Sequence, residues 1–404
     1  MERAGVFHFI TDHSVSEAPA PQLHKDSLPK NEKSGSPGPG DVKHYHRIKL
    51  TAGLVHSALA FLLTIAVVAT GLTNLVEEAI RGIVSNDYLV LLGFAGILGL
   101  GESLLSLPLR FYVGFRLEHR YRLSNQSFGA WIWERIKGLL VGLPLMSGVL
   151  LVLFFCLRSF GAWWWLPVGV VLFFFSVLLA RIAPILIFPL FYTFKPLEDG
   201  PLKDRITVLC KQAGVRIKGI FVFNMSKTTK KANAAFTGIG KSKRIILGDT
   251  LVANFTDDEI ESVFAHELGH YTLNHIWKMI AIGTFSTFAG LYLTAIVFDA
   301  SLSWFGFPAR ETIAALPLLG LWLSVYSLIT APLNNMISRA NERAADSYAV
   351  RAAGNKEAFV GALRKLGTIN MADFTPHPLI EFLFYSHPSL GKRIAAVETL
   401  PVES

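Results

Sequence analysis

Long apolar runs alternate with polar segments along most of this chain. After a polar beginning, the first run starts at Leu50 and meets no charged residue until Glu77. Each run approaches or exceeds the roughly 20 apolar residues that a helix needs to cross a bilayer core of about 30 Å. The later runs cover residues 88–109, 138–157, 159–180, 279–298 and 312–338. The pattern predicts six membrane-spanning helices.

These runs divide the chain into five segments. Residues 1–45 are rich in Pro, Gly and Ser without a helical or strand period, which predicts a disordered polar tail. Residues 46–194 hold four or five membrane helices, because a further apolar run after Arg181 is short and contains Pro184 and Pro189. Residues 195–278 and 339–404 are polar, and residues 279–338 hold two more membrane helices.

The first polar segment has the pattern of a water-facing α+β unit. Short runs of β-branched and aromatic residues at 219–223 and 243–247 predict strands. A helix start follows at Thr256, which can accept a hydrogen bond from the first free amides while Glu259 reaches back to it. We therefore expect a helix that runs from this point into the segment around His266.

Composition agrees with a membrane protein and excludes other classes. Charged residues make up only 17% of the chain and hydrophobic residues 51%, whereas soluble proteins carry about 25% charged residues. The net charge of +8 is scattered between apolar runs, so we expect membrane lipid and no nucleic acid as a partner. With only two cysteines, the chain offers neither a disulfide framework nor a cysteine metal site.

The distribution of Lys and Arg predicts the orientation of the spans. Six crossings place the tail, the 110–137 loop and both polar segments on one side, and these parts hold nearly all basic residues. Because positive residues concentrate in cytoplasmic loops, the polar segments should face the cytoplasm. The membrane is then the bacterial inner membrane or the endoplasmic reticulum, depending on the source.

A metal-binding pattern lies on the predicted helix after Thr256. His266 and His270 are four residues apart, so both imidazoles share one helix face and can meet one ion. Glu267 stands beside that face, where its carboxylate can take a proton from an attacking water. Gly269 costs a helix about 1 kcal/mol relative to alanine, and a close backbone approach near the ion would explain it. A helix with two surface histidines is the alternative.

A catalytic zinc site needs a third protein ligand and an open position. Directly after the last apolar run, Glu342 and Asp346 lie four apart on one helix face. We predict Glu342 as the third ligand and Asp346 as a hydrogen-bond partner of a ligand histidine or of the catalytic water. Ordinary surface charge on a solvated helix remains the alternative for both.

From about residue 88 to 395 the chain resembles the M48 family of membrane zinc metalloproteases, specifically the Ste24-like CAAX prenyl proteases. The matching motifs are Glu118 to Asn125, Ile182-Ala183-Pro184, Phe194 to Leu197, Asn233-Ala234, Lys243 to Leu251, His266 to His270, Ser338-Arg339 with Glu342 and Asp346, and Ser386 to Leu390 with Arg393.

The resemblance implies a multi-span α-helical membrane protein with a zincin-like α+β metalloprotease domain, built from residues 195–278 and 339–404. It implies one Zn²⁺ per chain, held by His266, His270 and Glu342, with Glu267 as the base. It also implies helices that enclose a chamber within the membrane.

The same resemblance implies further roles. Asp346 would support the ligands or donate a proton, and His387 and Arg393 would line the cleft near the metal. We interpret His387 as a donor to the oxyanion of the reaction; capping of the loop before Pro388 is its alternative. Asn233 and Ala234 would form the strand edge that binds an extended substrate.

The expected substrate is a peptide or protein, with a prenylated CAAX cysteine near its C-terminus as the class that the resemblance implies. Turnover of misfolded membrane proteins without a prenyl requirement is the main alternative. Two other classes are an inactive membrane scaffold or chaperone and a transporter. Glu102 within an apolar run could line a cavity or pair with a base, or it could be protonated against a neighbouring helix.

Overall fold

The computed structural model describes residues 38–238 and 243–401, and all of these belong to one compact unit, Ser36–Ser404. Within them, six helical stretches are long and apolar enough to cross a membrane, which confirms the predicted number. They are Gly40–Ala69, Asp87–Arg120, Phe128–Ser159, Gly161–Phe191, His275–Phe305 and Ile313–Ala353.

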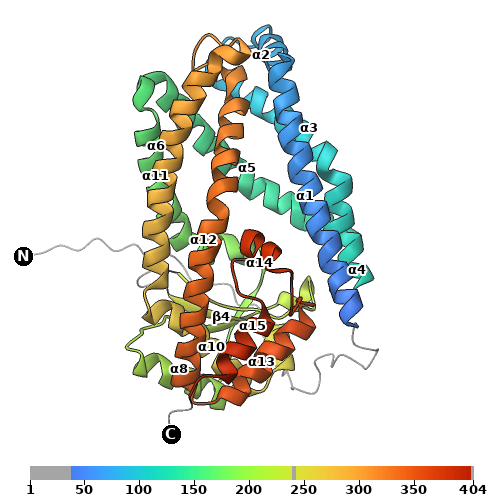
Figure 1. Cartoon of the computed structure of the whole chain (residues 1–404), viewed down its shortest axis with the longest axis vertical. Coiled ribbons are helices and arrows are strands. Elements are labelled where there is room, and N and C mark those ends of the chain that lie inside the picture. The colour runs from blue at the N-terminus through green and yellow to red at the C-terminus, as the bar shows by residue number, and fades with distance from the viewer. Residues whose placement is uncertain (1–37, 239–242, 402–404) are drawn as a thin grey trace, which may run out of the picture. The chain divides into compact units, whose positions relative to one another are not determined.

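The membrane part consists of two groups of helices, with residues 192–274 of the water-facing domain between them in the chain (Figure 1). The helices are α1 (Pro39–Ala69), α2 (Leu72–Arg81), α3 (Asp87–Phe111), the π-helix η2 (Tyr112–Leu117), α4 (Glu118–Arg120), α5 (Phe128–Ser159), α6 (Trp165–Ile182), the π-helix η4 (Ala183–Ile187), α7 (Phe188–Phe191), α11 (His275–Ser301) and α12 (Leu316–Ala353).

The short run after Arg181 is not a separate span. It continues α6 through η4 into α7, within the single stretch Gly161–Phe191. Pro184 has no N–H for the α-helical ladder, and the helix passes this point with a π-helical turn. The first group of membrane helices therefore contains four stretches of spanning length in the described part of the chain.

The predicted disordered tail also ends earlier than residue 45. The helix α1 begins at Pro39, and residues 1–37 lie outside the described part of the chain. The helix is fixed here because Tyr45 is buried at 2% exposure, in a cluster with Leu117, Leu123 and Met371. This packing joins the start of the first span to parts of the chain that follow much later.

The water-facing part is built on a four-stranded mixed sheet. Its strands are β1 (Phe194–Pro196), β2 (Ile220–Phe223), β3 (Ala234–Thr237) and β4 (Arg244–Gly248), in the order β1-β2-β4-β3. The central pair β2 and β4 is parallel, and the outer pairs are antiparallel. Both predicted strands are confirmed as β2 and β4, and β3 forms one edge of the sheet.

Several helices of this domain share one apolar core with the sheet. They are α8 (Pro201–Gln212), α9 (Asp249–Asn254), α10 (Asp257–Thr272), α13 (Lys356–Ile369) and α15 (Leu390–Glu398). The short helix α14 (Pro378–Phe384) packs against α12. The core includes Ile206, Leu247, Phe264 and Phe359, so segments from both polar parts of the sequence form one domain. The predicted fold class, a multi-span membrane protein with an α+β protease domain, is confirmed.

One helix joins the membrane part to this domain. The predicted boundary between residues 338 and 339 lies inside α12, which continues unbroken from Leu316 to Ala353 (Figure 1). At the other ends of the spans, Asp87 pairs with both Arg81 and Arg158, at 2.7 and 2.6 Å. The side chains of α12 that enter the domain are therefore held by the same helix that spans the bilayer.

Candidate metal centre and substrate cleft

The helix α10 begins as its sequence predicts. Thr256 Oγ1 accepts a hydrogen bond from the Glu259 amide at 3.3 Å, and Glu259 Oε2 accepts one from the Thr256 amide at 2.8 Å. These reciprocal bonds satisfy two amides that the first helical turn leaves free. The cap fixes the helix start, and the helical period then places His266 and His270 on one face.

Gly269 lets α10 approach α12 closely. A Cβ atom at this position would lie 3.2 Å from the Cα of Ala345 and 3.1 Å from a ring carbon of Tyr348. Few real Cβ atoms have contacts this short, and the Ala345 contact is with backbone, which cannot move aside easily. The glycine inside the motif is thus explained by helix packing beside the candidate metal site.

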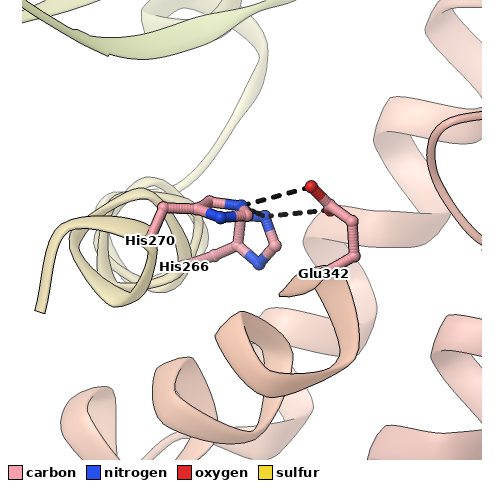
Figure 2. A group of neighbouring side chains, drawn as sticks. All are labelled: His266, His270 and Glu342. Atoms are coloured by element: carbon pink, nitrogen blue, oxygen red, sulfur yellow. Dashed lines mark hydrogen bonds and ion pairs between the residues drawn. The ribbon is translucent and has the colours of Figure 1, made fainter. Parts of the chain in front are cut away.

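The close approach brings Glu342 of α12 to the two histidines of α10. Figure 2 shows the imidazoles and the carboxylate pointing toward one another. His266 Nε2 lies 3.2 Å from His270 Nε2 and 3.4 Å from Glu342 Oε2, and His270 Nε2 lies 3.2 Å from Glu342 Oε1. Three side chains from two helices therefore meet at one point.

This geometry fits a divalent cation. Two ligand atoms at about 2.0–2.1 Å from one tetrahedral ion lie about 3.3 Å apart, close to the separations of 3.2 and 3.4 Å in the cluster. Glu342 is buried at 4% exposure, and its Oε2 accepts no hydrogen bond from the described residues. A buried carboxylate oxygen without such a partner is costly unless it meets a charge.

The pKa of His266 also indicates a position that favours positive charge. Burial would lower its pKa, but the nearby carboxylates of Asp346 at 2.8 Å and Glu342 at 3.4 Å outweigh burial and raise the pKa to about 9. The two carboxylates thus create a position that favours positive charge, which a proton or a metal ion can supply.

Asp346 connects the cluster to Arg393 of α15. Its Oδ1 accepts a hydrogen bond from His266 Nδ1 at 2.8 Å and one from Arg393 Nη2 at 2.6 Å, and its Oδ2 accepts one from Arg393 Nε at 2.9 Å. The bidentate pair fixes the carboxylate, and the carboxylate fixes the ring of His266 with Nε2 toward Glu342. Partners of this kind orient metal-ligating histidines in proteins.

His270 has a corresponding partner that sequence reasoning missed. His275, at the start of α11, places its Nδ1 3.1 Å from the Nδ1 of His270 and is 7% exposed. The contact holds the ring of His270 with Nε2 toward Glu342. The only signal in the sequence was a histidine five residues after the motif, at the end of a polar segment.

His387 approaches the cluster on the loop after α14. Its Nε2 lies 3.3 Å from Glu342 Oε1, and its Nδ1 lies 2.9 Å from the hydroxyl of Ser386. The side chain is 62% exposed, so it faces open space beside the cluster. The structure therefore places His387 beside Glu342, at the edge of the histidine cluster.

The loop is held by Arg339, which sequence reasoning quoted only as part of a motif. Arg339 is buried, and its Nη1 donates to the carbonyls of Glu381 at 3.0 Å and Tyr385 at 2.6 Å. One turn earlier on α12, the amide of Asn335 donates to the Leu383 carbonyl at 2.8 Å. The helix that carries Glu342 thus also positions the loop of His387.

A cleft of about 590 Å³ opens beside the cluster. The half-buried Glu267 lines it, and so do His266, Glu342, His387 and Arg393. His270 and Asp346 lie behind these residues, at the cluster but not in the lining. Three further lining residues, His46 of α1, Asn370 and Tyr385, carried no recognisable signal in the sequence.

The edge strand β3 borders the same cleft. Asn233 and Ala234 line it, as predicted for the substrate-binding edge. Asn233 turns inward to β4, because its carbonyl accepts a hydrogen bond from the Gly248 amide at 2.9 Å. In an antiparallel pair the backbone direction alternates, so the N–H and C=O of Ala234 point to the open side of the sheet.

Glu102 lies apart from this centre. Its carboxylate binds Arg110 at 2.8 Å, and His56 of α1 lies 3.7 Å away. The sequence left two interpretations open, a carboxylate that lines a cavity or pairs with a base and a protonated acid against a neighbouring helix. The geometry agrees with a Glu102 carboxylate that pairs with a base.

Comparisons with known protein families match almost the whole chain. Residues 196–400 match the model of peptidase family M48, and residues 41–193 match a model described as the CAAX prenyl protease N-terminal region with five membrane helices. Over that second range the structure has four stretches of spanning length and the short helix α2 between two of them.

Curated relatives come from bacteria and eukaryotes. The uncharacterized metalloprotease YhfN of Bacillus subtilis is 29% identical over 88% of this chain and 84% of its own length. CAAX prenyl protease 1 of Saccharomyces cerevisiae is 33% identical over 76% of this chain and 71% of its own. The human CAAX prenyl protease 1 homolog is 27% identical, over 74% and 71%.

A solved structure has the same fold. The crystal structure of S. mikatae Ste24p superposes with a TM-score of 0.80 at 28% identity, and the match covers 91% of this chain and 93% of that one. The likeness therefore includes the membrane helices and the domain that carries the histidine cluster.

Proposed function

The chain belongs to peptidase family M48, and from this premise we propose that it hydrolyses peptide bonds with one zinc ion held by His266, His270 and Glu342. As a member of the family it is a metalloendopeptidase of the Ste24 type, embedded in a membrane. The observation that carries the proposal is the meeting of these three side chains at one wall of a cleft that a strand edge also borders.

The metal identity is inferred from the donor set. Two imidazoles and one carboxylate are a ligand set typical of catalytic zinc, with a fourth position left for water or substrate. When bound, zinc polarises the substrate carbonyl and makes water a stronger acid.

Glu267 is the group that moves the proton in this proposal. It follows the ligand His266 directly and lines the cleft. Its carboxylate takes the proton of the attacking water and then returns it to the leaving amine. Zinc cannot do this alone, because the amine leaves only once it is protonated.

His387 and Arg393, which also line the cleft, support the reaction in this proposal. His387 is exposed to the cleft 3.3 Å from Glu342, where an imidazole N–H can donate to the developing oxyanion. Arg393 holds Asp346, and Asp346 holds His266, so both contribute through the orientation of a ligand. Asp346 is thereby a positioning residue in this proposal.

The substrate lies as an added strand along β3. The outward N–H and C=O of Ala234 offer backbone hydrogen bonds that require no particular substrate side chain. A strand edge gives affinity through the main chain, and the pockets beside it decide which side chains fit. This mode suits a protease of broad tolerance.

For the substrate class we infer a C-terminal CAAX peptide with a prenylated cysteine. Relatives in yeast, plants and animals are named CAAX prenyl proteases. The cleft is lined in part by His46 of α1, a helix long enough to cross the membrane. A peptide that is anchored to the bilayer by an isoprenoid chain can therefore reach the cleft without leaving the membrane surface.

General turnover of membrane proteins is the second candidate. It is favoured by the backbone-directed edge of β3, which makes no demand for a lipid group. In either case the abundance of Lys and Arg in the polar segments predicts that the cleft faces the cytoplasm. The membrane is the inner membrane of a bacterium or the endoplasmic reticulum.

Cleavage assays on the detergent-purified protein separate these functions. One CAAX-ending peptide is offered with and without a farnesyl group, each beside a Glu267→Gln control and after removal of the metal. Loss of the base should lower kcat by about 10²- to 10⁴-fold while zinc stays bound. Zinc-dependent cleavage only of the farnesylated peptide supports prenyl-protein processing.

Equal cleavage of both peptides keeps the metalloprotease and favours general proteolysis. If neither peptide is cleaved above the Glu267→Gln control, the proposed hydrolysis is contradicted, and an inactive scaffold becomes the better explanation.

A further inference from the structure

The segment directly before the edge strand is held by groups from distant parts of the chain. Lys231 and Ala232 lead into Asn233, and Ala232 is buried at 3% exposure. The backbone carbonyl of Lys231 accepts a hydrogen bond from Thr250 Oγ1 at 2.7 Å. The position of the start of β3 therefore depends on how these two residues are fixed.

The side-chain amide of Asn370 forms two hydrogen bonds with the backbone of Ala232. Its Oδ1 accepts from the Ala232 amide at 2.9 Å, and its Nδ2 donates to the Ala232 carbonyl at 3.1 Å. The side-chain amide thus takes the place of a neighbouring strand, which would form the same two bonds. Asn370 ends α13 and itself lines the cleft.

Met371, which follows Asn370, connects these two hydrogen bonds to the first membrane helix, α1. Met371 is 1% exposed and adopts a positive φ of 51°, which turns its carbonyl toward α1. His46 Nε2 lies 2.6 Å from that carbonyl oxygen. Residues 370–371 are therefore hydrogen-bonded to α1 on one side and to the residue before β3 on the other.

Glu118, which belongs to the membrane part, forms an ion pair with the side chain of Lys231. Its Oε2 lies 2.9 Å from Lys231 Nζ, while its Oε1 accepts from Tyr45 Oη at 2.6 Å and from Lys49 Nζ at 3.0 Å. The carboxylate side chain is only 14% exposed, so the ion pairs are partly shielded from water. One acid thus joins α1, the end of the second span and the segment before β3.

We propose that Glu118 and Asn370 are positioning residues for the substrate. By fixing Lys231 and Ala232, they set the free edge of β3 at the distance from the metal cluster that places the scissile bond at the ion. This inference rests on the proposed function, since it needs a substrate that pairs with β3. It assigns a purpose to Glu118, the first residue of a motif that the hydrolytic chemistry itself does not use.

The physical reason is the precision that hydrolysis demands. Displacement of a reacting group by about 1 Å can cost on the order of 10²-fold in rate. If Ala232 moves, the backbone N–H and C=O groups of β3 shift with it, because they belong to one short, stiff strand. A loosened anchor therefore acts on substrate pairing and leaves the metal ligands in place.

The test compares Asn370→Ala with Asn370→Asp, Glu118→Gln and a matched control. Asn370→Asp keeps the acceptor for the Ala232 amide and loses the donor. The control is Asn355→Ala, since Asn355 caps the other end of the same helix α13, at 2.9 Å from the Ala358 amide, and does not line the cleft. Zinc content and thermal unfolding are measured for each variant.

The substrates are the farnesylated CAAX-ending peptide and a series with one backbone N-methyl group moved along it. In the wild type, methylation of an amide that pairs with β3 should lower kcat/KM by about tenfold. Asn370→Ala should lower kcat/KM for the unmodified peptide by about tenfold and lose most of the methylation effect, with zinc retained. Glu118→Gln should behave alike, and Asn370→Asp should recover part of both values.

Two results would overturn the positioning role. In one, the variants keep the full methylation effect, so that the losses simply add. In the other, they lose thermal stability as Asn355→Ala does but keep the wild-type kcat/KM.

Failure of the premise gives a different pattern. A wild type that cleaves every methylated peptide equally well contradicts pairing with β3, and the positioning role falls with it. A wild type no more active than Glu267→Gln contradicts hydrolysis itself.

Discussion

Glu342 is the side chain on which the proposed metal centre depends most, because it alone comes from a different helix than the two histidines. A buried carboxylate oxygen without a hydrogen bond is unfavourable unless it meets a positive charge. Around it, Asp346 and His275 orient the histidine rings from behind. At this scale both histidine rings are fixed by a side chain from outside the cluster.

Asp346→Asn tests that support. The amide can still accept from His266, but it loses the charge and the bidentate pair with Arg393, so metal affinity should fall by about 10- to 100-fold. Competition with a chelating dye measures the affinity. Asp204→Asn removes an exposed carboxylate from α8 and should leave the affinity unchanged; equal affinities in all three proteins would contradict the role.

At the scale of elements, the contact between α10 and α12 creates the site. Neither helix carries all three of the proposed ligands, and the close approach of the pair is helped by the absence of a side chain at Gly269. The cap at Thr256 fixes where α10 begins, and the length of α12 carries Glu342 from the membrane part to the cluster. A small displacement of one helix therefore opens the ligand set.

Gly269→Ala tests the crossing. Alanine favours a helix by about 1 kcal/mol over glycine, yet here the added Cβ would press on the backbone of Ala345 and move α10 outward. We expect at least about tenfold weaker zinc binding, measured by dye competition. Gly283→Ala on α11 is the control, because a Cβ there meets nothing within 4 Å. Unchanged zinc binding in Gly269→Ala would show that the helices need not approach so closely.

The pattern of the sequence predicts elements well where one local rule decides them. Six spans follow from run length, and the start of α10 follows from the Thr256 and Glu259 pair. After Arg181 the structure continues α6 through a π-helical turn, which length and prolines alone do not distinguish from the start of a new helix. The tail boundary failed because the polar start of α1 is fixed by burial of Tyr45 against later parts of the chain.

At the scale of the whole described unit, the six spans sort the connecting segments onto two sides. Glu118, Tyr45 and Lys231 meet at one end, and Arg81, Asp87 and Arg158 meet at the other. The cleft beside the histidine cluster belongs to the end that contains Lys231 and Asn370. The fold thereby places the cleft and the edge strand β3 at the same end of the spans.

Labelling of single introduced cysteines tests this arrangement in sealed vesicles of known orientation. Asp199 and Ser303 are both exposed and lie at opposite ends of the spans. An impermeant maleimide added to the extracytoplasmic side should label Ser303→Cys at once, and Asp199→Cys only after permeabilisation. The native thiols should stay silent, because Cys156 and Cys210 are buried and burial raises the pKa of Cys210 to about 11.

Labelling of both introduced cysteines from the same side would contradict six crossings. Labelling with the sides exchanged would keep the fold but place the cleft outside the cytoplasm.

The sequence by itself determined the spans, the cap of α10 and the pairing of His266 with His270, because each depends on contacts within a few residues of one helix. It also identified Glu342 and Asp346 as candidates from their spacing. Only the tertiary structure decided that Glu342 reaches the histidines, that Arg339 holds the loop of His387, and that Asn370 and Glu118 fix the entry to β3. These contacts join segments far apart in the chain, and the packing of whole elements, which no local period encodes, brings them together.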